Sequence, residues 1–122
     1  MRVLLIAFAA GQLALGLLLW LAPGFFYDEI GPYPPQNDHY MADLATFYLA
    51  LGAAALAAVS RAGWRVPVLA LALVHYALHS LNHLVDIGDA ETSWLGPANF
   101  VALALTAGLL AWLLRRESEV RA

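Results

Sequence analysis

The sequence has no cysteine and no lysine, and it has few charged residues of any kind. Without cysteine the chain can form neither disulfide bonds nor thiolate metal sites, and it offers no cysteine nucleophile. Charged residues make up 12% of the chain, about half the share found in average soluble domains. All basic residues are arginines, the net charge is −3, and no basic cluster exists beyond Arg115 and Arg116. We therefore expect no nucleic-acid partner.

The most prominent feature of the sequence is its long apolar segments. Of its 122 residues, 62% are hydrophobic, and the mean hydropathy is +0.70. Four apolar segments each approach the roughly 20 residues that a helix needs to cross a bilayer. They run over residues 2–22, 40–60, 66–87 and 98–114. The sequence predicts an all-α integral membrane protein, with residues 1–122 as a single domain and the lipid bilayer as its main partner.

Proline and glycine separate these segments. Pro23 and Gly24 end the first, Pro67 suits the first turn of the third, and Gly96-Pro97 opens the fourth, because a helix start tolerates the missing proline donor. Short connections predict antiparallel neighbours, hence an up-down four-helix bundle. The run after Arg2 is long and no small-x-small cleavage site precedes Pro23, so we expect a span there and not a signal peptide.

The arginines predict the orientation of the bundle. All of them fall on one side of the predicted spans, while most acidic residues fall on the other. The arginines are Arg2, Arg61, Arg65, Arg115, Arg116 and Arg121. Since positive charge is retained in the cytoplasm, we expect both termini and residues 61–65 to be cytoplasmic, residues 23–39 and 88–97 to lie outside, and the protein to be a multi-pass protein of the cell inner (plasma) membrane.

Polar residues interrupt the third predicted span in the stretch "HYALHSLNHLVD", residues 75–86. At 100° per residue, one helix face carries the four side chains His75, His79, His83 and Asp86, with Asn82 at its edge. This face extends over about 16 Å, from mid-bilayer to the outer interface. Ionisable groups within a membrane are costly, so such a stripe predicts a functional site.

Other polar residues fall close to this stripe in the predicted bundle. The second span begins with Asp38, His39 and Asp43 on the same outer side, and Gln12 lies midway along the first span. We expect these groups to line an outward-opening cavity between the second and third spans. The alternative is a seam of hydrogen bonds between helices, which is the commoner role for a single polar residue in a membrane.

Histidines four residues apart on a helix can hold one metal ion, and His79 with His83 is the best pair. A third ligand from His39, Asp43 or Asp86 would complete a site for zinc, copper or iron. Haem is disfavoured, because histidines on one helix cannot approach it from opposite faces. A proton path along the stripe is a further option, although no polar residue continues it toward the cytoplasm.

The stretches "LLWLAPGFF" and "DLATFYLALGAAALA", together with the layout of four short spans and an extended outer loop, resemble the small DoxX-like bacterial membrane proteins. The resemblance implies a four-helix membrane bundle, and some relatives are linked to respiratory or redox assemblies. It assigns no site residues, because "HYALHSLNHLVD" is not part of that general pattern.

These observations predict a membrane protein that binds a metal ion or another small ligand and is not an independent enzyme. One alternative is an accessory or assembly subunit of a larger membrane complex, respiratory or redox, whose polar stripe packs against its partner. Besides the bilayer, the expected partners are further copies of this chain in a homo-oligomer or such a larger complex. Another is a membrane oxidoreductase that uses the site for a metal or a quinone.

Overall fold

The computed structural model describes residues 1–120, which form five α-helices and no β-strand. The helices are α1 (Arg2–Leu21), α2 (Pro23–Glu29), α3 (Asp38–Ser60), α4 (Ala62–Val85) and α5 (Leu95–Glu119). All except α2 are long and apolar enough to cross a membrane. The predicted all-helical class with four candidate spans is confirmed. Arg121, one of the arginines used to predict the orientation, lies outside the described residues.

The helix boundaries differ from those predicted, most of all at the C-terminal end of α5, which continues to Glu119 and not only to residue 114. Two of the differences involve proline. Residues 23–39 were expected to be loop, but Pro23 opens the short helix α2, since a proline that cannot extend α1 still suits a first turn. Pro67 was expected in the first turn of its helix, whereas α4 begins at Ala62 and places Pro67 inside it. Because proline has no backbone N–H, the carbonyl of Gly63 has no helical hydrogen-bond donor. Gly63 is exposed and close to the helix start, where such a loss is tolerated. Pro97 does lie in the first turn of α5.

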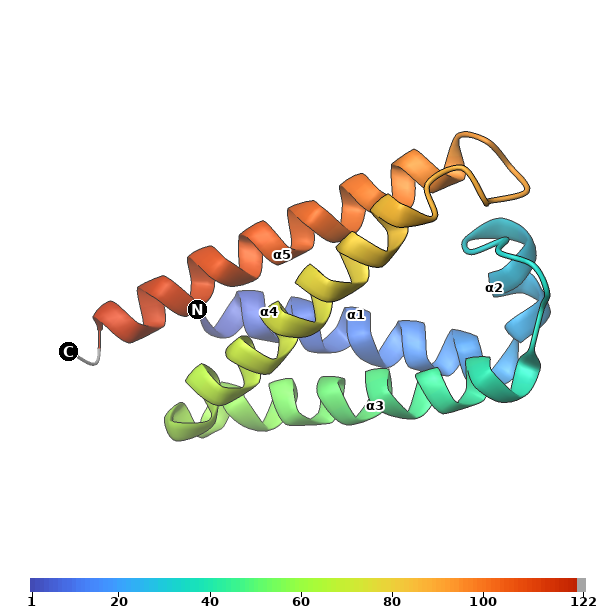
Figure 1. The fold of residues 1–122 in the computed structure, drawn as a ribbon. Coiled ribbons are helices and arrows are strands. Elements are labelled where there is room, and N and C mark those ends of the chain that lie inside the picture. The colour runs from blue at the N-terminus through green and yellow to red at the C-terminus, as the bar shows by residue number, and fades with distance from the viewer. Residues whose placement is uncertain (121–122) are drawn as a thin grey trace.

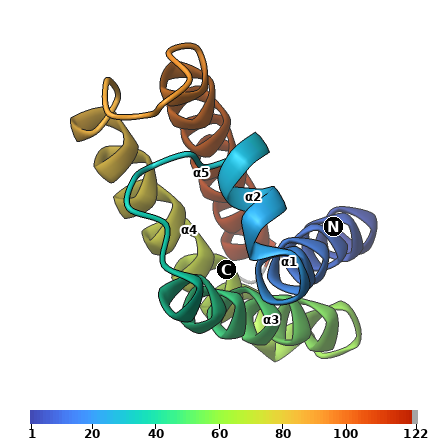
Figure 2. The ribbon, with the colours of Figure 1, turned by 90° about the vertical axis from the view of Figure 1, so that its right-hand side faces the viewer.

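The four long helices form two pairs. α1 packs along α3, and α4 packs along α5, while α4 meets α3 mainly near the turn at Arg61 (Figure 1). The pairs diverge away from that turn. Viewed from the diverging end, α2 and the loop that follows it lie between the two pairs (Figure 2). The cavity described below lies in this region.

Glycines allow α1 and α3 to approach closely. A Cβ atom added at Gly16 would lie 2.7 Å from Leu49 Cγ, and one added at Gly52 would lie 2.8 Å from Leu13 Cγ. Each helix therefore offers a glycine to a leucine of the other, as expected where lipid provides no hydrophobic drive between helices. Gly11 and Gly108 have no such neighbour within 4 Å.

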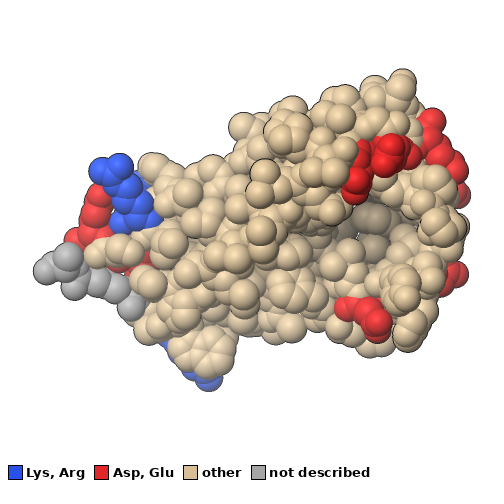
Figure 3. All heavy atoms as spheres, in the orientation of Figure 1, with Lys and Arg blue, Asp and Glu red and all other residues tan. Residues whose placement is uncertain are grey.

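Charged side chains gather at opposite ends of the molecule (Figure 3). We call the end with the α3–α4 turn the arginine end, because Arg61, Arg65, Arg115 and Arg116 lie there. The acidic end carries Asp28, Glu29, Asp89 and Glu91 on α2 and on the loop before α5. Arg65 joins three helices at the arginine end, because its Nε donates to the Ala58 carbonyl of α3 at 3.1 Å and its Nη1 lies 3.4 Å from Glu117 of α5.

Candidate functional site

His79 and His83 form a pair on the inner face of α4. They lie one helical turn apart, and their Nε2 atoms are separated by 3.2 Å. The ring centroids are 4.9 Å apart, and the ring planes are tilted by 43°. The shared face expected from the four-residue spacing is therefore confirmed for this pair.

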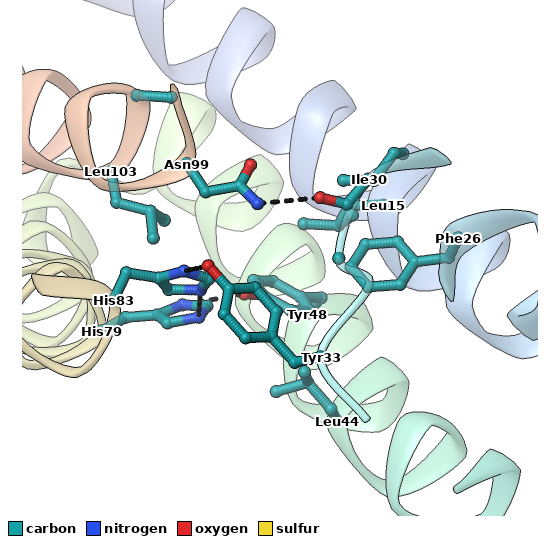
Figure 4. A pocket seen from close by; sticks show the side chains of 12 residues that line it. Leu15, Phe26, Ile30, Tyr33, Leu44, Tyr48, His79, His83, Asn99 and Leu103 are labelled. Atoms are coloured by element: carbon teal, nitrogen blue, oxygen red, sulfur yellow. Dashed lines mark hydrogen bonds between the residues drawn. The ribbon is translucent and has the colours of Figure 1, made fainter. Parts of the chain in front are cut away.

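Each histidine of the pair also meets a tyrosine. The Tyr33 hydroxyl lies 3.0 Å from His83 Nδ1, and the Tyr48 hydroxyl lies 3.4 Å from His79 Nδ1. Tyr33 comes from the loop after α2, and Tyr48 comes from α3. Polar contacts thus link four side chains from three separate segments in the order Tyr33–His83–His79–Tyr48. We call this set the Tyr–His chain (Figure 4).

The Tyr–His chain lines a cavity of about 290 Å³ between the two helix pairs. Apart from these four residues and Asn99, the wall is formed by apolar side chains and Gly31. The apolar members are Leu15, Phe26, Ile30, Leu44, Ala102 and Leu103. An apolar wall with a few converging polar groups is the usual character of a small-molecule site.

The loop after α2 covers this cavity and is held there by hydrogen bonds from α5 and from the loop that precedes α5. Asn99 Nδ2 of α5 donates to the Ile30 carbonyl at 2.8 Å (Figure 4). The backbone N–H of Glu91 donates to the Pro32 carbonyl at 3.0 Å. These bonds fix the cover to the loop and helix on the opposite side of the cavity.

Tyr33 separates the cavity from a more polar recess at the acidic end. That recess has a volume of about 420 Å³ and is lined by Tyr33, Pro34, Asp86 and Asp89. The surface is visibly hollowed at this end, with acidic side chains around the opening (Figure 3). Burial raises the pKa of the Tyr33 phenol above its usual value; a hydrogen bond from Asn99 opposes this shift, and the charges of Asp86 and Asp89 add to it.

His75 lies one turn deeper than His79, among aromatic rings. Its ring centroid is 4.5 Å from that of Phe47 and 5.3 Å from that of Tyr76. Within residues 1–120, His75 Nε2 is buried and makes no hydrogen bond. Beside it, Gln12 of α1 and Tyr76 of α4 bond each other reciprocally, with Gln12 Nε2 donating at 2.8 Å and the Tyr76 hydroxyl donating at 3.1 Å. Gln12 therefore acts as a hydrogen-bond partner between helices, which was the alternative to a role in lining the cavity.

The acidic residues of the predicted site have other partners. His39 and Asp43 pair with each other at 3.6 Å on an exposed part of α3. Asp86 accepts a hydrogen bond from Asn82 at 3.2 Å, and Asp38 accepts one from Gln36 at 2.7 Å. Over residues 1–120, no three histidine or acidic side chains gather in a group that could hold a metal ion.

The expected cavity lining therefore needs correction. Of the predicted residues only His79 and His83 line the cavity, whereas Gln12 and His75 lie deeper, Asp86 faces the polar recess, and Asp38, His39, Asp43 and Asn82 lie elsewhere. The physical reason is the divergence of the pairs at the acidic end. The start of α3 packs beside α1 there and not against α4, so its polar side chains do not reach the histidine pair.

Sequence reasoning missed Tyr33, Tyr48 and Asn99. Tyr48 and Asn99 are polar residues inside apolar segments, and that feature could have marked them as candidates. Tyr33 belongs to a proline-rich loop, "GPYPPQ", where nothing local points to a partner fifty residues away.

No protein-family model, curated protein or solved structure matches this chain. The resemblance to DoxX-like proteins therefore stays a prediction, and the case for function rests on the geometry of the site.

Proposed function

We propose that this protein is a multi-pass membrane protein that binds a small, largely apolar ligand in the cavity between its helix pairs. The observation that carries the proposal is the Tyr–His chain, which turns polar atoms from three segments toward an otherwise apolar cavity. Such a site favours a ligand with an apolar body and at least one hydrogen-bonding oxygen or nitrogen. At about 290 Å³, the cavity suits a molecule at the lower end of the usual size range.

The proposal includes an orientation in a bacterial inner membrane. The four long helices run up and down, the arginine end with both termini faces the cytoplasm, and the acidic end faces outward. The support is the separation of arginines from acidic loops, because short loops rich in arginine are retained on the cytoplasmic side. In this orientation the cavity and the polar recess beside Tyr33 open toward the outside.

Two tryptophan substitutions on α5 test ligand binding. Leu103 lines the cavity, while Leu105 of the same helix is 70% exposed and does not line it. We expect Leu103→Trp to fill the cavity and Leu105→Trp to leave it open. Mass spectrometry of organic extracts from the purified proteins should then find a stoichiometric small molecule with wild type and Leu105→Trp, and lose it with Leu103→Trp. Equal extracts from all three proteins, matching a detergent and lipid blank, would contradict the proposal.

A second candidate is an accessory role in a larger membrane complex. The most apolar stretch of α5 is the least buried among those of the four long helices. Its exposed residues Val101, Leu105 and Leu109 recur every four positions and form one stripe. If a partner helix covers this stripe, Leu105→Trp should release a subunit that co-purifies with wild type in mild detergent, while Leu103→Trp should retain it.

A further inference from the structure

We propose that His79 and His83 together bind a divalent transition-metal ion through their Nε2 atoms, on the wall of the cavity. This inference rests on the proposed function, because the metal would be the group that anchors the polar end of the cavity ligand. It also revises the sequence prediction, in which carboxylates completed the site.

The separation of the two nitrogens fits a shared ion. Zinc–imidazole bonds are about 2.0–2.1 Å long, and a tetrahedral ion places two such ligands a little over 3 Å apart. The Nε2 atoms lie 3.2 Å apart. The pair can therefore take up a metal with little movement of either ring.

The orientation of the rings agrees with that distance. The ring centroids are 4.9 Å apart, appreciably more than the 3.2 Å between the Nε2 atoms. Both rings thus lean toward a common point near their Nε2 tips. The same separation also fits a hydrogen bond between the two nitrogens when one of them carries a proton, so metal binding at the pair would release that proton.

The tyrosines occupy the other nitrogen of each ring. A metal-bound imidazole normally donates its remaining N–H to an oxygen, which fixes the tautomer and the ring orientation. Here the hydroxyl oxygens of Tyr33 and Tyr48 lie 3.0 and 3.4 Å from the two Nδ1 atoms. When both Nδ1–H groups donate to these oxygens, both Nε2 atoms present lone pairs to each other. A cation between them resolves that repulsion.

His79 and His83 both line the cavity, so the remaining coordination positions of the ion would be accessible from it. His39, Asp43 and Asp86 have partners of their own, so the described part of the chain adds no third histidine or carboxylate. An ion held by two histidines keeps positions open for water or for an oxygen or nitrogen of the cavity ligand. Open positions are the mark of a metal that acts on a bound molecule and not of one that only stabilises a fold.

The test uses full-length protein in detergent, treated with EDTA, dialysed and then titrated with ZnCl₂ in a calorimeter. We expect one zinc ion per chain. His79→Ala and His83→Ala should each weaken binding at least tenfold, while His39→Ala and His75→Ala serve as matched controls and should bind as wild type does. Tyr33→Phe and Tyr48→Phe remove the oxygens behind the ligands and should weaken binding by about tenfold or more.

A spectroscopic measurement covers the case in which a histidine variant does not fold. Cu²⁺ added to wild-type protein should show electron paramagnetic resonance splittings from two nitrogen ligands. Absence of stoichiometric zinc binding, or zinc binding that survives both histidine substitutions, would overturn the metal site. If zinc binding fails, the organic extract of untreated wild-type protein separates the two proposals: a stoichiometric ligand keeps the cavity site without the metal, and an extract equal to the detergent and lipid blank removes both.

Discussion

At the scale of single residues, Tyr33 has the most consequential position. Its hydroxyl contacts His83, and its side chain lines both the apolar cavity and the polar recess beside Asp86 and Asp89. The ring also packs edge-on against His83, with centroids 5.0 Å apart. Tyr33 therefore stands between the apolar cavity and the recess at the acidic end.

Ionisation of Tyr33 should destabilise the protein at alkaline pH. Its pKa is raised in the folded state, chiefly by burial, so the folded state holds the phenolic proton more tightly than the unfolded state does. The resulting stability is fully present below the unfolded pKa of about 10 and is lost as pH rises through the higher folded pKa. Melting temperatures of wild type should therefore fall more steeply above about pH 10 than those of Tyr33→Phe. Tyr40→Phe, a change at an exposed tyrosine, should follow wild type; identical slopes for all three would exclude this role.

The reciprocal bond between Gln12 and Tyr76 should be measurable as a coupling. Both residues are buried, and their two hydrogen bonds join α1 to α4. Gln12→Ala and Tyr76→Phe should each lower the free energy of unfolding, and the double variant should lose less than the sum. We expect a coupling of about 0.6 kcal/mol and at most about 1.7 kcal/mol, the range measured for such bonds in membranes. Strictly additive losses in a double-mutant cycle would show that the bond contributes nothing.

At the scale of helices, the α1–α3 pair is the rigid wall of the cavity. It is held by close contacts at both glycines, with Gly16 against Leu49 and Gly52 against Leu13. The same pair carries Leu15, Leu44 and Tyr48 into the cavity wall. The separation of α1 and α3 therefore affects the position of the Tyr48 hydroxyl relative to His79.

Alanine at either of these glycines should weaken the pair. A Cβ atom at Gly16 would also approach the Ala45 carbonyl oxygen at 3.1 Å, and one at Gly52 would approach the Ala9 carbonyl oxygen at 3.1 Å. Because backbone atoms yield little, Gly16→Ala and Gly52→Ala should each cost about 1–3 kcal/mol in unfolding free energy. Gly11→Ala and Gly108→Ala have open space and should cause no loss. Equal effects at all four positions in detergent unfolding would argue against the close approach.

At the scale of the whole molecule, the cavity lies toward the end that carries the acidic side chains and away from the end that carries the arginines. Arginines lie at the end where the helix pairs meet, and acidic side chains surround the end where they diverge. The cavity lies toward the diverging end, beneath α2 and its loop. An orientation imposed by the arginines would therefore also determine the side from which a ligand enters.

Cysteine labelling tests this orientation, because the chain has no native cysteine. Single cysteines at Gln36 and Thr92 lie in exposed loops at the acidic end, and one at Gly63 lies at the exposed α3–α4 turn. In intact cells an impermeant maleimide should react with the first two and not with the third. Permeabilised cells provide the control, in which all three should react. Reaction at Gly63 in intact cells, together with silence at the other two, would invert the proposed topology.

The sequence by itself determined the features that depend on one segment at a time. Apolar runs of spanning length made the four long helices predictable, and the 3.6-residue period placed His79 and His83 on one face. The tertiary structure alone decided which residues join that pair. Tyr33 and Tyr48 reach the histidines, and Asp43 and Asp86 do not, because these contacts depend on how the two helix pairs diverge and on where the loop after α2 crosses the opening. Hydropathy and local periodicity contain no information about either, since both result from side-chain packing between segments distant in the chain.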